Sequence, residues 1–346
     1  REGSDFSHEP VIRIENSVNI QVETLTVLAL QQGEGVLIDQ VDKKSDHIES
    51  VSHGFVSQVE VKNIVLEKLR IQAGERSAIR CESGKQIKIR NNFIRMRDEQ
   101  GPWPGIFVVG ERVLVSDNSI TVLTKEDGSE FPGDSDRNVV GRGGIQIGGT
   151  SEEVRVQHNF IKGGSGDGIT LGSLSLGVED EAPIVRSMAH FMVFDDQNTR
   201  HGSSLIRIPG SVSPEVLSHE LDHLEMRRDV NIEEILEIDA NGNIAKTPDV
   251  VSAGDLYNID LSENRIENMG RNGIGVVGFF DLEETDEFIS IENLTISHNR
   301  IEACLNGALP EINANLEDDM GYGGIALADV LNLRIHNNDI ENNGSN

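Results

Sequence analysis

A short pattern of apolar and polar positions recurs along the whole chain. Each copy reads apolar, any residue, apolar, two polar residues, Asn, any residue, Ile, as in IKIRNNFI, VRVQHNFI and LTISHNRI. The alternation of apolar and polar side chains predicts β-strands rather than helices. The asparagine of the pattern stands at six positions, which are Asn92, Asn118, Asn159, Asn264, Asn299 and Asn338.

A second signature, Gly-Ile followed by any residue and an apolar residue, precedes most copies of the first. It occurs at Gly105-Ile106, Gly144-Ile145, Gly168-Ile169, Gly273-Ile274 and Gly324-Ile325. The tightest repeat, from Gly144 to Gly168, has a length of 24 residues. Such short strands cannot bury their apolar sides alone, but they can when they stack on identical neighbours. We therefore predict an all-β fold, a right-handed parallel β-helix of about eight coils, roughly 40 Å long.

The recurring asparagine suits a turn between two strands of a coil. Asparagine tolerates left-handed backbone and forms local hydrogen bonds. Stacked asparagine side chains also bond to one another along an axis, as in other ladders. In the first two copies of the pattern, Leu25 and Leu69 occupy the ladder position.

These repeats resemble the pectin-lyase-like right-handed parallel β-helix superfamily, with its CASH-type repeats. The resemblance covers the chain from Val11 to Asn346, apart from the insertions. The superfamily contains pectate lyases, polygalacturonases, epimerases, phage tailspikes and non-catalytic surface proteins, so it specifies a fold more than a function. It implies that any chemistry lies on the strand that follows each Gly and on the loops beside it.

A long insertion interrupts the repeats between Ile169 and Asn264. It divides the chain into N-terminal coils (1–176), an inserted α+β subdomain (177–254) and C-terminal coils (255–346). Within it, Ser213 and Pro214 predict the start of a helix, and Asn241-Gly242 predicts the turn of a β-hairpin.

The outward side chains of the strand after each Gly should form one face of the solenoid. They are Arg80, Phe107, Gln146, Thr170, Gly275 and Ala326. The face carries one Arg and no carboxylate, whereas glycoside hydrolysis requires paired carboxylates and a calcium-dependent lyase requires clustered Asp. No catalytic constellation is visible on these residues.

Candidate binding residues lie mainly in two long acidic loops after Asn118 and Asn299. Loops on one side of a rigid scaffold often carry function. Trp103 and Tyr322 are candidate sugar-stacking residues, and Asp167 lies in a GDG turn before a strand. The complete set is Trp103, Asp134, Asp136, Arg137, Arg142, Asp167, Asp318, Asp319 and Tyr322. Dense carboxylates favour weak binding of a cation such as calcium, the one cofactor that we consider.

The formal net charge of −29 disfavours two classes of partner. It repels nucleic acid and anionic membrane surfaces, and no apolar run reaches the length of a membrane span. The chain starts without an initiator Met, so we expect it to be part of a longer protein, extracellular or at the cell surface. Cys81 and Cys304 should lie several coils apart, too far for a disulfide.

The stretch SHELDH contains H-E-x-x-H, a spacing typical of zinc hydrolases. In a helix that starts near Pro214, His219 and His223 would face away from the leucine stripe and towards solvent. It also resembles the helix motif of peptide deformylases, but the other segments of that family are absent or misplaced. We therefore predict no metal site here.

The sequence favours a non-catalytic β-helix module of a larger protein, whose acidic loops and insertion bind a glycan or a protein. The alternative is a polysaccharide lyase, hydrolase or epimerase that acts on a glycan along the β-helix face.

Overall fold

The computed structural model describes ten segments of the coils and four short strands within the insertion. The segments are residues 10–29, 33–40, 60–74, 76–96, 103–122, 143–164, 166–177, 249–276, 289–305 and 323–344, and the short strands lie at 193–194, 200–201, 237–238 and 244–246. All regular elements in these ranges are β-strands. In the same ranges, no helix has the length and hydrophobicity that a membrane crossing requires.

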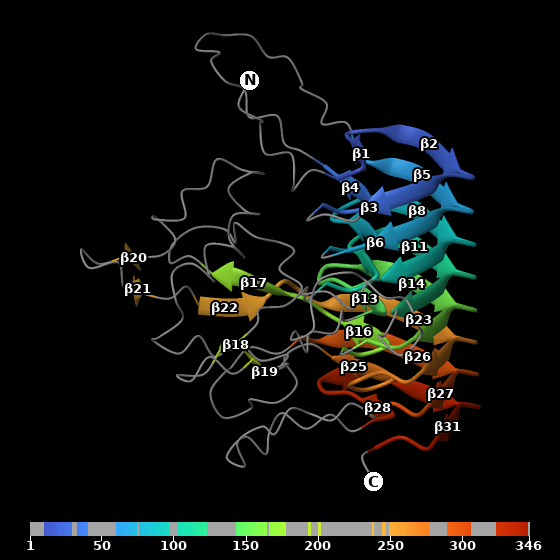
Figure 1. Ribbon diagram of the computed structural model, residues 1–346. Helices are drawn as coiled ribbons and strands as arrows, with labels where there is room; N and C mark the ends of the chain where they lie inside the picture. Colours follow the sequence, from blue (N-terminus) through green and yellow to red (C-terminus); the bar gives the residue numbers. More distant parts are fainter. Residues whose placement is uncertain are drawn as a thin grey trace.

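The strands form three parallel sheets (Figure 1), and each sheet receives one strand from every coil, except that the last coil gives sheet B two short strands. Sheet A contains β1 (Ile12–Glu15), β4 (Val36–Asp39), β7 (Ile79–Cys81), β10 (Ile106–Val108), β13 (Ile145–Ile147), β16 (Ile169–Leu171), β25 (Ile274–Val276) and β28 (Ile325–Ala326). Sheet B contains β2 (Val18–Glu23), β5 (Lys62–Glu67), β8 (Lys85–Arg90), β11 (Glu111–Ser116), β14 (Glu152–Gln157), β23 (Leu256–Ser262), β26 (Ile291–Ser297), β29 (Val330–Leu331) and β30 (Arg334–His336). Sheet C contains β3 (Thr26–Ala29), β6 (Arg70–Ala73), β9 (Phe93–Met96), β12 (Ser119–Val122), β15 (Phe160–Lys162), β24 (Arg265–Glu267), β27 (Arg300–Glu302) and β31 (Asp339–Glu341).

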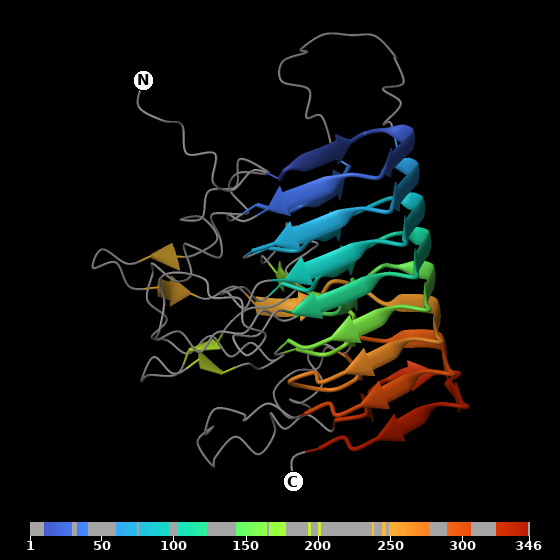
Figure 2. The same ribbon diagram turned by 45° about the vertical axis from the view of Figure 1, so that its right-hand side comes forward.

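The chain therefore winds through sheets A, B and C in turn, and it completes eight coils. Coil 1 contains β1 to β3 and coil 8 contains β28 to β31; the large insertion separates β16 from the other strands of coil 6. Figure 2 shows the coils stacked in chain order, from blue at the N-terminal end to red at the C-terminal end. This arrangement confirms the predicted β-solenoid of about eight coils.

A continuous apolar core fills the interior of the coils. The inward residues of all three sheets belong to one cluster, and most of them are fully buried. The two sequence signatures meet inside this core. A Cβ on Gly168 or Gly273 would collide with the side chain of Ile266 or Ile301, the Ile of the first signature in the same coil. The Gly of the second signature thus allows a close approach to the Ile of the first signature that a side chain would block.

The six ladder asparagines lie in one turn, between sheets B and C, and they bond head to tail. The Nδ2 of each donates to the Oδ1 of the asparagine in the next coil, at 2.9–3.0 Å, from Asn92 through to Asn338. The same Oδ1 accepts the backbone N–H of the preceding asparagine, as Asn118 Oδ1 does from Asn92 at 3.0 Å. The ladder starts at Leu69, whose N–H donates to Asn92 Oδ1.

The ladder asparagines lie in a turn and bond along the axis, as predicted, but they are not the left-handed residues of that turn. The residue immediately before each of them has the positive φ in every coil, as at His158 (55°) and Glu263 (56°). The ladder side chains are buried in coils 3 to 7 and half-buried at Asn338, and their amides bond to backbone groups of the turn, which makes this burial tolerable. The left-handed residue points outward, so its type varies from coil to coil.

The insertion leaves the solenoid through a two-stranded ribbon. Strand β17 (Leu174–Gly177) pairs antiparallel with β22 (Asp249–Ser252), and Gly177 lies opposite Asp249. Two further antiparallel pairs are β18 (Val193–Phe194) with β19 (Arg200–His201), and β20 (Glu237–Ile238) with β21 (Ile244–Lys246). The last pair brackets the predicted hairpin turn, whereas the predicted helix after Ser213 lies outside the described residues.

Neither cysteine forms a disulfide in the structure, as predicted. Cys81 lies in the core, in register with Val108, and Cys304 belongs to the same core cluster. Burial raises the pKa of the Cys81 thiol to about 12 and that of Cys304 to about 11. Both thiols are therefore protonated near neutral pH and are poor nucleophiles.

Candidate functional site

The outer face of sheet A is the first place to look for a site. The predicted outward residues stand side by side in register across neighbouring coils. They are nevertheless buried: the exposed fraction is 6% for Arg80, 1% for Phe107, 0% for Gln146 and 6% for Thr170. In coils 3 to 8 this face is therefore covered, whereas Arg13, at the same position in coil 1, is exposed.

Arg80 is the centre of a charged and aromatic cluster on this face. Its Nε donates to Glu82 Oε1 at 2.6 Å, and its Nη1 lies 3.8 Å from Glu34 Oε1. Its guanidinium lies 4.5 Å from the ring centre of Trp103 and 5.6 Å from that of Phe107. These cation–π and ionic contacts compensate the burial of the charge.

Trp103 completes the cover over Arg80. Its ring is 7% exposed, packs with Phe107 and Val109, and has a second guanidinium, that of Arg76, at 5.0 Å. A ring in contact with two guanidinium groups and two apolar side chains has little surface left for a sugar. Trp103 thus stabilises the closed face in this structure.

Asp167, the other described candidate, has a structural role in a turn beside the same face. Its Oδ1 accepts the backbone N–H of Asn272 at 2.9 Å and the side-chain amide of Asn272 at 3.1 Å. The Oδ1 of Asn272 in turn accepts the N–H of Gly323 in the following coil. A Cβ at Gly275 would lie 2.8 Å from Asp167 Oδ2, so the glycine makes room for the carboxylate.

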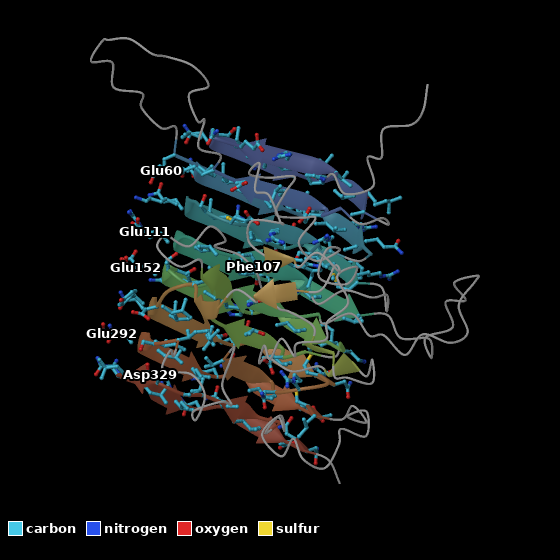
Figure 3. The ribbon with its side chains drawn as sticks, turned by 90° about the vertical axis from the view of Figure 1, so that its left-hand side faces the viewer. Glu60, Phe107, Glu111, Glu152, Glu292 and Asp329 are labelled. Carbon is cyan, nitrogen blue, oxygen red and sulfur yellow. The ribbon has the colours of Figure 1, made fainter. Side chains whose placement is uncertain are left out.

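A row of carboxylates marks one long edge of the solenoid. Figure 3 shows Glu60, Glu111, Glu152, Glu292 and Asp329 along this edge. Lys85 Nζ bridges Glu60 and Glu111 at 2.8 and 3.2 Å, and these contacts raise the pKa of the lysine. The pKa of Tyr257 is raised, chiefly by the negative charge of Asp255. In the register of sheet B, Tyr257 lies between Glu152 and Glu292. No group of three or more metal-binding side chains occurs in the part of the chain that the structure describes.

The remaining candidates lie outside the described residues, and their predicted roles stay predictions. These are Asp134, Asp136, Arg137 and Arg142 in one long loop, Asp318, Asp319 and Tyr322 in the other, and the whole SHELDH stretch.

The sequence also contains a second asparagine row, which its repeat pattern does not reveal. Asn63 Nδ2 donates to Asn19 Oδ1 at 2.7 Å, Asn293 to Asn258 at 3.0 Å, and Asn332 to Asn293 at 3.1 Å. All five have positive φ and are exposed. Each stands six residues before a ladder position, as Asn258 does before Asn264, and this spacing is the signal that could have identified the row.

Comparisons with protein-family models, curated proteins and solved structures give no match for this chain.

Proposed function

We propose that the chain is a non-catalytic β-solenoid module of a larger extracellular or surface protein, and that its acidic loops and insertion bind a glycan or a protein. The observation that carries this proposal is the burial of the outward side chains of sheet A. In the pectin-lyase-like proteins that the repeats resemble, this strand face is where chemistry is expected. Here Arg80, Trp103 and Phe107 occupy it with contacts to one another.

The positions of the long connections support a binding role. Two of them join sheet C to sheet A, between β12 and β13 and between β27 and β28, and the insertion joins β16 to β23. A rigid stack of coils holds such segments at fixed attachment points, while their sequences vary without cost to the core. Most of the acidic residues of the chain lie in segments outside the described coils, whereas most of the basic residues lie within them.

The test is a panel of neutral, acidic and basic polysaccharides, assayed both for binding and for products. Affinity electrophoresis detects binding, and assays for new reducing ends and for unsaturated sugars detect hydrolysis and elimination. The proposal predicts no products from any polysaccharide. Turnover of any member of the panel would contradict it.

A shortened variant tests the role of the insertion. Because Gly177 and Asp249 lie opposite each other in the antiparallel ribbon, residues 178–248 can be replaced by Asn-Gly, a two-residue hairpin turn. We expect this variant to keep the circular dichroism spectrum of the coils and to lose binding to any partner that the insertion recognises. In a control variant, residues 124–141 of the acidic loop are replaced by a short Gly/Ser linker. Comparison of the two variants shows whether the insertion or the acidic loop binds the partner.

One observation favours the alternative of a polysaccharide-active enzyme. Glu34 and Glu82 flank Arg80 on sheet A, so carboxylates and a guanidinium do come together on that face. If the panel reveals turnover, Arg80→Gln should abolish it, while Arg300→Gln on the exposed face of sheet C should not. The calcium-dependent form of the reaction would in addition be lost on chelation.

A further inference from the structure

The exposed face of sheet C carries a charge pattern that is complementary to itself. One outward row contains Arg95 in coil 3 and Lys162 in coil 5, followed by Glu267, Glu302 and Glu341 in coils 6, 7 and 8. Gln72 and Thr121 stand in the same row and are uncharged. The row is therefore basic towards the N-terminal end of the solenoid and acidic towards the C-terminal end.

The neighbouring outward row adds exposed aromatic rings to the basic half. It contains Phe93, which is 41% exposed, and Phe160, which is half-buried. In coils 6, 7 and 8 the same row continues with Arg265, Arg300 and Asp339, so the net negative charge of the face lies in coil 8. Arg95 lies 5.1 Å from the ring centre of Phe93, and Arg265 lies 5.6 Å from that of Phe160. Exposed aromatic rings beside arginines are the residue types that protein–protein interfaces favour.

From this pattern we propose that the outer face of sheet C is a contact surface for a second copy of the chain. The occupant packs face to face, with its solenoid axis reversed, about a two-fold axis that runs parallel to the strands between coils 5 and 6. Coil 3 of one copy then lies opposite coil 8 of the other, and coil 5 lies opposite coil 6. Arg95 faces the partner's Glu341, and Lys162 faces the partner's Glu267.

Each ion pair forms twice, because a two-fold contact is self-complementary. Phe160 also faces the partner's Arg265, so the aromatic row gains a cation–π contact across the interface. The acids of coils 6 and 7 already bond to Arg265 and Arg300 within their own chain. The Arg300–Glu302 pair is open to solvent and contributes little to stability, so sharing of Glu302 costs little. The Glu267 side chain is 12% exposed, so Lys162 of the second copy adds to its pair with Arg265 rather than replacing that arginine.

The size of the face makes the contact weak. Six coils at ~4.8 Å and strands of about four residues at ~3.3 Å give roughly 380 Å² per copy, about half of the area that stable complexes bury. The net charge of −29 also repels a second copy over long distances. We therefore expect a transient dimer whose strength depends on ionic strength.

The test is a charge exchange read by sedimentation velocity on the full chain. At about 0.1 M salt the Debye length is ~10 Å, so long-range repulsion is screened more than the close ion pairs, and we expect a monomer–dimer equilibrium. At about 1 M salt the pairs are screened too, and the dimer is lost. Arg95→Glu and Glu341→Arg, as single variants, should each weaken the dimer by about tenfold or more, because each places like charges opposite each other.

The double variant Arg95→Glu with Glu341→Arg should restore the wild-type dimer. The two positions lie five coils apart in one chain, roughly 24 Å, so this rescue has to act between copies. Lys62→Glu and Arg334→Glu change the charge at exposed positions outside sheet C and serve as matched controls that leave the dimer unchanged. Should a single reversal disturb the fold, Arg95→Gln and Glu341→Gln remove the pair without repulsion and should still weaken the dimer.

Three results would overturn the proposal. These are a monomer at every concentration and salt tested, a double variant no better than either single variant, and an association that persists in about 1 M salt. The last outcome would place the contact on an apolar surface, such as the exposed end of coil 8 around Ile335 and Ile340.

Discussion

The ladder asparagines show how one residue type satisfies a buried turn. In the middle of the ladder, Asn159 is 1% exposed and donates to Asn264 Oδ1 and to the backbone carbonyl of Val115. Its Oδ1 accepts both the N–H and the side-chain amide of Asn118. Few other side chains of this size supply both an NH₂ group that donates two hydrogen bonds and an oxygen that accepts. The ladder therefore requires an amide, and another polar side chain would not replace it.

We predict that Asn159→Ala lowers the free energy of unfolding by roughly 2–5 kcal/mol, because it leaves two buried donors of Asn118 without an acceptor. The matched control is Asn293→Ala in the exposed asparagine row. This variant removes similar amide–amide bonds, but these bonds are in contact with water. Because the residue also has left-handed backbone, we expect the free energy of unfolding to fall by about 1 kcal/mol. Urea unfolding followed by circular dichroism measures both. Equal losses for the two variants would show that burial does not set the value of the bond.

Cys81 gives a prediction in alkaline solution. The pKa of its thiol is raised by burial, and next by Glu82, from 9.0 to about 12. Between these values the unfolded chain releases the thiol proton and the folded chain keeps it. The contribution of Cys81 to the free energy of unfolding is therefore complete below pH 9 and falls as pH rises towards 12.

Cys81→Ala should remove that part of the alkaline loss, so wild type and variant should converge in stability as pH rises above 9. Denaturant unfolding at a series of alkaline pH values measures the difference. A difference between the two proteins that stays constant with pH would mean that the thiol titrates normally in the folded state.

At the scale of the element, the burial of an inward side chain depends on the coil that follows it. Ile301 in β27 and Ile340 in β31 stand in register, and both point towards the core. Ile301 is 0% exposed, whereas Ile340 is 45% exposed at the last described coil. The isoleucine therefore contributes the free energy of full burial in coil 7 and only part of that free energy in coil 8.

Ile301→Ala should cost about 2–5 kcal/mol, the range for a large-to-small change in a packed core. Ile340→Ala should cost about 1 kcal/mol or less. Thermal and denaturant unfolding of the two variants, compared with wild type, measure this. A similar loss at both positions would show that the end of coil 8 is covered in solution.

The sequence predicts these elements well where the coils repeat, and poorly where they do not. Ile301 and Asn299 recur at fixed spacing because each coil presents the same environment to them. The cover over sheet A depends on residue types that change from coil to coil. Arg76 and Trp103 both stand three residues before the strand of sheet A, and Glu34 stands two residues before it, so the repeat fixes the positions but not the residue types. The second asparagine row was missed because Gln86, Arg112 and Glu153 replace Asn in three consecutive coils.

At the scale of the whole molecule, charge is distributed unevenly between the coils and the segments they carry. The described coils hold most of the basic residues, and the loops and insertion hold most of the acidic ones. Like charges at high density repel one another, and a divalent cation relieves that repulsion.

We therefore expect weak binding of calcium by the long acidic loops. Calorimetric titration should show heat at low salt that decreases as salt is raised, together with a small rise in melting temperature. Exchange of the loop carboxylates Asp134, Asp136, Asp318 and Asp319 for Asn should reduce both effects. If calcium produces neither heat nor a shift in melting temperature, the acidic loops serve only solubility.

The outer face of sheet A is closed over coils 3 to 8. Arg80 is the residue that a catalytic groove on this face would use, and its guanidinium is held by Glu34, Glu82 and the ring of Trp103. Among the described residues of coils 3 to 8, burial of these groups closes the strands of sheet A to a polymeric substrate. With this face closed, we expect a partner to bind the loops or the other faces of the solenoid.

Trp103 is the one tryptophan in the chain, so tryptophan fluorescence, excited where tyrosine does not absorb, reports on this face alone. The most direct test is acrylamide quenching of that fluorescence, in native protein, in denaturant, and in the presence of each polysaccharide of the panel. A closed face predicts weak quenching in the native state, strong quenching in denaturant, and no change on addition of any polysaccharide. Native quenching as strong as in denaturant, or protection of Trp103 by a polysaccharide, would mean that sheet A has an open groove and would contradict the account.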